Sequence, residues 1–153
     1  MATITIADIR IGFTNRIALM TDFWEAPVPE PLFGPSQVPD AIPATKAHLA
    51  FVVGVPSTPK FLGREKASVP VFAETVVRVR FMARHVAGDE TSKTSHDVAL
   101  HAEHRIIKQV MAQSASWPGY PIGIESVTRG LNPSGEWFLT EINFLARHPF
   151  ALQ

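Results

Sequence analysis

A chain of 153 residues, 46% of them hydrophobic, is expected to form one globular domain with a sizeable core. Fourteen basic residues balance fourteen acidic ones, so no overall field draws the chain to nucleic acid or to an anionic membrane. The chain has no cysteine, which excludes disulfides, thiolate metal sites and cysteine nucleophiles. No apolar run approaches the ~20 residues that span a bilayer, and the first residues lack a signal-peptide pattern, so synthesis as a soluble cytoplasmic product is expected.

Near the start of the chain, apolar residues recur at three- and four-residue steps, which predicts a helix over residues 5–21. Thr5 is placed to cap this helix, and Asp8 falls in its first turn, where a negative charge is favourable. The stripe expected to face the core consists of Ile6, Ile9, Phe13, Ile17 and Met20.

A proline-rich segment follows, with nine of the thirteen prolines between Pro27 and Pro70. Prolines at this density exclude a regular helix and an interior strand. Residues 24–43 nevertheless contain large apolar side chains of the kind that interface cores use. Either this segment packs on its own domain, or it is an extended arm that reaches a neighbouring chain. Its candidate anchors are Trp24, Leu32 and Phe33.

Two strands are predicted next, separated by a turn-rich connection over residues 56–70. His48–Val55 is rich in β-branched and aromatic residues, and residues 72–86 alternate between two faces. One face would carry Val77, Val79, Phe81 and Ala83, and the other Arg78, Arg80, Met82 and Arg84.

The remaining elements are a second helix and a hairpin. The helix is predicted after Ser95, with Glu103 facing solvent, and residues 122–130 and 135–148 form two strands around the turn "LNPSG". The order predicts an α+β fold over residues 1–153: a single, mainly antiparallel sheet of about four strands, two helices on one face, and a long Pro-rich loop. The expected core residues are Phe81, Ile106, Val110, Ile142 and Phe144.

Few residues suggest a catalytic, metal-binding or cofactor-binding site. "FMARH", ending at His85, and "FLARH", ending at His148, look like two strand ends that place an aromatic residue in the core and charge at a sheet rim. His101 and His104 share a helix face without the spacing of a zinc-protease motif. No nucleophile elbow or phosphate-binding glycine loop is present. We therefore expect neither enzyme activity nor a cofactor, and none of these four histidines is expected to bind metal.

Over residues 70–148 the chain resembles the tail terminator proteins of long-tailed bacteriophages. The segments are "TVVRVRFMARHV", "HDVALHAEHRIIKQVMAQ", "IESVTRG" and "SGEWFLTEINFLARH". In that family a strand leads through a polar turn to an amphipathic helix, and a final strand is entered through a Gly-acidic-Trp turn, here Ser134-Gly135-Glu136-Trp137. The Pro-rich stretch has no counterpart in the resemblance.

The resemblance implies a structural role in a virion. Family members form a six-subunit ring on the head-proximal end of the tail tube, stop its polymerisation and dock the neck. The implied partners are further copies of the chain, the tail tube protein and a neck or head–tail connector protein, at the tail–neck junction. DNA would pass through the lumen without sequence-specific binding. A connector or neck protein is the nearest alternative, and a small enzyme or ligand-binding domain a more distant one. The candidate contact residues are Trp24, Leu32, Phe33, Arg78 and Arg80.

Overall fold

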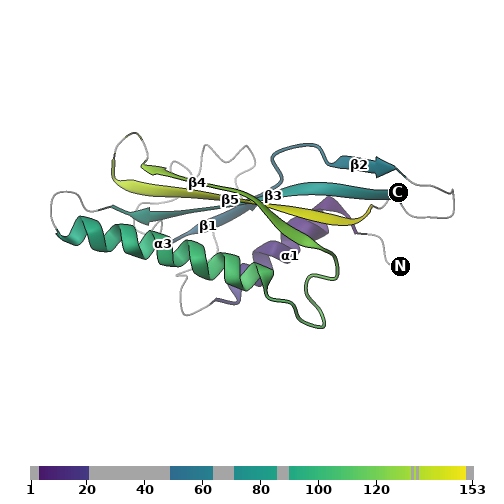
Figure 1. The fold of residues 1–153 in the computed structure, drawn as a ribbon, viewed down its shortest axis with the longest axis horizontal. Helices are drawn as coiled ribbons and strands as arrows, with labels where there is room; N and C mark the ends of the chain where they lie inside the picture. Colours follow the sequence, from purple (N-terminus) through teal and green to yellow (C-terminus); the bar gives the residue numbers. More distant parts are fainter. Residues whose placement is uncertain are drawn as a thin grey trace.

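The computed structural model describes residues 4–20, 49–63, 71–85, 90–131, 133 and 135–150. In these ranges the chain forms one open antiparallel sheet of five strands with two helices on the same side of it (Figure 1). The predicted α+β fold is confirmed. Neither of the two helices is long and apolar enough to cross a membrane. The elements in chain order are α1 (Ile6–Ala18), β1 (Phe51–Gly54), β2 (Lys60–Gly63), β3 (Val71–Arg84), α3 (Glu90–Met111), β4 (Ile122–Leu131) and β5 (Trp137–Phe150).

Helix α1 begins as the sequence predicts. The hydroxyl of Thr5 accepts a hydrogen bond from the backbone N–H of Asp8, and the Asp8 carboxylate accepts one from the backbone N–H of Thr5, which is a capping box. The helix ends at Ala18, three residues earlier than predicted. Its buried residues are Ile9, Phe13 and Ile17.

The sheet has the strand order β1-β3-β5-β4, and β2 pairs with the first half of β3. The two long central strands pair along their whole length, from Val71 with Phe150 to Arg84 with Trp137. The predicted hairpin joins β4 to β5. The fifth strand, β2, was missed because its four residues lie among turn-forming residues and show no clear alternation.

Helix α3 begins at Glu90, six residues before the predicted start. Ser95 therefore lies inside the helix and is buried, rather than capping it. The side chain of Glu103, predicted to face solvent, is also buried. The apolar side of α3 that faces the core consists of Ala99, Ala102, Ile106 and Val110, which are all buried.

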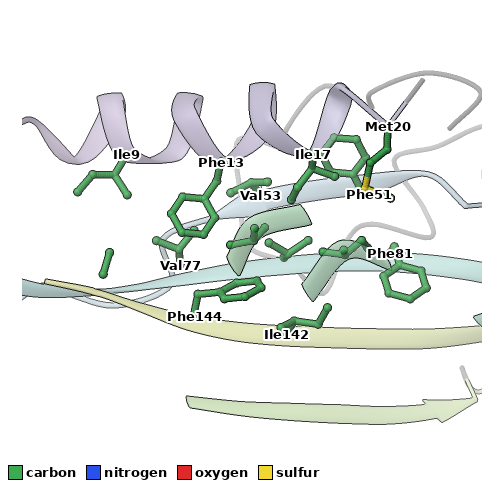
Figure 2. Close-up of a cluster of buried hydrophobic side chains, with 14 of the residues drawn as sticks. Ile9, Phe13, Ile17, Met20, Phe51, Val53, Val77, Phe81, Ile142 and Phe144 are labelled. Carbon is green, nitrogen blue, oxygen red and sulfur yellow. The ribbon is translucent and has the colours of Figure 1, made fainter. Parts of the chain in front are cut away.

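The core lies between the helices and the covered face of the sheet, where α1 points Phe13 at β3 and β5 (Figure 2). The ring of Phe13 lies 5.6 Å from that of Phe144 and 5.2 Å from that of Trp117, in an edge-on contact with the latter. All five residues expected in the core are at most 1% exposed: Phe81, Ile106, Val110, Ile142 and Phe144.

Arg16 of α1 holds the last turn of α3. Its guanidinium donates hydrogen bonds to the carbonyl oxygens of Gln109 and Ala112, at 3.0 and 3.1 Å, and lies over the ring of Trp117. The Gln109 side chain returns a hydrogen bond to the carbonyl of Arg16. Carbonyls in the last turn of a helix lack intrahelical donors, and a cation there also interacts favourably with the negative end of the helix dipole. The contact therefore fixes α1 against α3.

Candidate functional site

The face of the sheet away from the helices, here called the outer face, carries a row of polar side chains across its centre. The register sets Arg78 beside Asn143 and Arg80 beside Glu141, on neighbouring strands. On β4, Ser126 lies beside Asn143 and Thr128 lies beside Glu141, so each pair extends onto a third strand. The outer-face polar cluster comprises Arg78, Arg80, Ser126, Thr128, Glu141 and Asn143.

Hydrogen bonds connect this cluster from strand to strand. Arg80 makes an ion pair with Glu141 through two of its guanidinium nitrogens. Arg78 donates from Nε to Oδ1 of Asn143 at 3.0 Å, and this nitrogen lies 3.9 Å from Oε2 of Glu141. Asn143 in turn donates to the hydroxyl of Ser126 at 3.0 Å. Two guanidinium groups thus share one carboxylate.

The cluster is partly withdrawn from water, because the side chains of Arg78, Arg80 and Glu141 are only 27%, 21% and 22% exposed. Burial, with the neighbouring charge of Arg78, lowers the pKa of Arg80 to about 10. Arg80 therefore remains protonated at neutral pH, and a cluster with two guanidinium groups and one carboxylate keeps an excess positive charge.

An apolar patch adjoins the polar cluster at the end of the outer face nearer Arg84. Val52 lies beside Arg80, and Met82 lies beside Leu139. The side chain of Trp137 is partly buried in this patch. The patch comprises Ala50, Val52, Met82, Trp137 and Leu139.

A second ion pair ties α3 to β4 on the covered side. Arg129 donates from Nε and Nη2 to the two carboxylate oxygens of Glu103, at 2.6 and 2.7 Å. The Glu103 side chain is 10% exposed, whereas that of Arg129 is 53% exposed. The buried charge of Glu103 therefore depends on Arg129, because little water can reach it. The charge of Arg129 depends less on Glu103, because water solvates the guanidinium group.

The antiparallel register separates the two similar pentapeptides. His85 follows β3 and bonds through Nδ1 to the carbonyl of Gly135, whereas His148 lies opposite Ala73 near the other end of β3. The prediction that both place charge at a sheet rim is wrong for His148, which is 0% exposed inside β5. The strand continues to Phe150, so "FLARH" is not its end.

His148 is held as a neutral ring. Its Nδ1 lies 2.9 Å from the carbonyl oxygen of Pro149, which only accepts, so Nδ1 carries the proton. Its Nε2 then accepts from the hydroxyl of Thr75 at 2.7 Å. Burial lowers the pKa of His148.

This depressed pKa predicts acid sensitivity. Below the unfolded-state pKa of about 6.5, the unfolded chain takes up a proton that the folded His148 resists, so stability should fall as the pH drops from about 6.5. Urea unfolding at a series of pH values measures this slope. His148→Gln should flatten the slope while lowering stability, and His104→Gln, at an exposed position of α3, should leave the slope unchanged. An equal slope in the wild type and His148→Gln would contradict the assignment.

No metal site is found in the part of the chain that the structure describes, where no three histidine, cysteine, aspartate or glutamate side chains are grouped to hold an ion. His101 and His104 are both exposed on α3.

Of the predicted contact residues, Arg78 and Arg80 come together in one cluster, while Trp24, Leu32 and Phe33 lie outside the described residues. The partners of these arginines, Glu141 and Asn143, were not predicted from the sequence, and neither was Arg129 as the partner of Glu103. The alternation along residues 135–148 was the available signal, but it does not say which strand lies alongside.

No protein-family model matches the chain, and no curated protein matches its sequence. Among solved structures, the fold is similar to a chain of the structure entitled "Virion of native gene transfer agent (GTA) particle". The TM-score is 0.46 at 12% sequence identity, over 88% of this chain and 84% of that one. A likeness this distant concerns only the arrangement of helices and strands.

Proposed function

We propose that this chain is a structural virion protein that forms a ring on the head-proximal end of a phage tail tube, stops the growth of the tube and docks the neck. The observation that carries the proposal is the outer face of the sheet. There, half-buried arginines lie beside an apolar patch containing Trp137 and Met82. Arginine, tryptophan and methionine are enriched in protein–protein interfaces, and arginine and tryptophan are frequent hot spots.

The sequence resemblance supports the same role. Its segments fall on β3, α3, β4 and β5, which form the sheet centre, its long edge and one covering helix. The chain also has no net charge, so long-range repulsion between copies is weak.

Tube capping tests the proposed role. Tail tube protein from the same genome would be polymerised with and without this protein, and tube lengths and ends would be measured by negative-stain electron microscopy. A terminator should shorten the tubes and leave a ring at one end. Unchanged tubes, with binding to isolated heads, would favour the connector role instead.

The arm over residues 24–43 is proposed to contact a neighbouring subunit, the tube or the neck. Prolines restrict the free chain, so ordering it on a partner costs less conformational entropy than ordering a flexible loop. Deleting Glu25 to Asp40 should leave the melting temperature of the domain unchanged while abolishing rings or tube capping. Circular dichroism and light scattering measure both properties. A truncated chain that unfolds would instead place the arm in the core of its own domain.

A further inference from the structure

The outer face carries a surplus of positive charge. The register places exposed Arg84 and Arg147 on the same face as the polar cluster, so β3 and β5 present four arginines and two glutamates there. The glutamates are Glu74 and Glu141. The chain as a whole has equal numbers of acidic and basic residues, so its remainder carries the matching negative surplus. A second copy of the chain therefore has acidic residues outside this face that can supply the opposite charge.

Arg78 has unused hydrogen-bond donors on this face. Its Nε donates to Asn143, but its two terminal nitrogens bond no residue in the described ranges. The nearby carboxylate of Glu141 is already engaged by Arg80. A half-buried cation without a full partner is unfavourable, and a carboxylate matches the two parallel donors of a guanidinium group.

The chain offers a suitable carboxylate at its long sheet edge. In the described ranges, Asp97 and Glu125 are exposed acids with no hydrogen bond or ion pair. Glu125 lies where the register of β4 shifts against β5, between Ile124 and Ser126, and no described strand lies beyond β4. Ile124 is 44% exposed, so apolar surface accompanies this charge, as in interface cores. Asp97, by contrast, lies on α3, where its neighbour in the sequence is the polar, exposed His96.

We propose that Arg78 of one copy binds the Glu125 carboxylate of a second copy, so that the outer face of one subunit receives the β4 edge of the next. Arg78 lies on a central strand and Glu125 on the edge strand, so a head-to-tail contact uses two different patches. Such a contact gives a ring when its rotation closes, and in this respect the inference rests on the proposed function. DNA fits the face less well, because Glu74 and Glu141 interrupt the arginines that a run of phosphates would need, whereas one carboxylate needs only one guanidinium group.

A charge swap tests the contact. The oligomeric state of the wild type, Arg78→Glu, Glu125→Arg and the double variant would be measured by sedimentation velocity over a concentration series at low salt. Each single reversal should weaken association by about 10-fold or more, and the double variant should restore it. Asp97→Arg is the matched control and should associate like the wild type. Because Arg78→Glu places a carboxylate beside Glu141, Arg78→Gln and a thermal melt of every variant accompany it.

The outcomes separate the contact from the ring. A wild type that stays monomeric at all concentrations, or single reversals that associate normally, would overturn the contact, and tube capping would still test the proposed function. A two-fold dimer that shows the loss and rescue would support the contact and count against the ring. A short fluorescent DNA duplex that binds the wild type but not Arg78→Gln, with association unaffected, would overturn the contact and assign the face to nucleic acid.

Discussion

Replacing Phe144 by alanine is expected to lower the free energy of unfolding by about 3–5 kcal/mol, the usual cost of truncating a buried phenylalanine. The Phe144 side chain is 0% exposed and lies against Phe13, so its loss removes the contact through which α1 packs on β5. Neighbouring strands fix the backbone on both sides of β5, which limits how far the cavity can collapse. Urea unfolding followed by circular dichroism measures the change.

Phe61→Ala provides the comparison for this substitution. Phe61 is also on a strand, but it is 50% exposed on β2, so the same change should cost about 1 kcal/mol or less. Similar costs at the two positions would show that the covered face of β5 has been assigned wrongly.

Arg129→Ala is expected to cost more than Glu103→Gln, although the two residues form one ion pair. Without Arg129, a carboxylate that is 10% exposed loses both of its hydrogen bonds, which should cost about 2–3 kcal/mol. Without the Glu103 charge, the 53% exposed guanidinium is simply solvated, and about 1 kcal/mol is lost.

A double-mutant cycle separates this asymmetry from general damage to the helix. Arg129→Ala combined with Glu103→Leu should recover part of the stability lost in Arg129→Ala, because an apolar side chain no longer needs compensation in that site. If the stability losses of Arg129→Ala and Glu103→Leu simply add up in the double variant, the ion pair does not determine the cost.

The sequence predicted elements well wherever one face of an element is buried. Strand β3 shows this most clearly, since Val77, Val79 and Phe81 alternate with Arg78 and Arg80 along it. A short edge strand such as β2 has neither the length nor the alternation to be distinguished from a turn. The early start of α3 was missed because Thr and Ser are weak helix formers that more often cap helices.

Pairwise contacts were predicted less well, for a different physical reason. The burial of Glu103 depends on Arg129 of a strand 26 positions later, and that of His148 on Thr75, 73 positions away. Alternation tells which face a side chain occupies, but the partner follows from strand order and register. For the same reason, Arg78 and Arg80 could be named as contact candidates before Glu141 and Asn143 were known to lie beside them.

The pairing of β3 with β5 has a consequence for how the chain reaches its fold. All of α3 and β4 lies between these two central strands in sequence, so the sheet centre forms only after a long loop has closed. Such non-local pairing makes folding slow. During synthesis, β3 emerges well before β5, so the side of β3 that pairs with β5 is then an unpaired, aggregation-prone edge even where β1 and β2 already pair with the other side. Arg78 and Arg80, spaced along this same strand, then act as charged gatekeepers before they act in any interface.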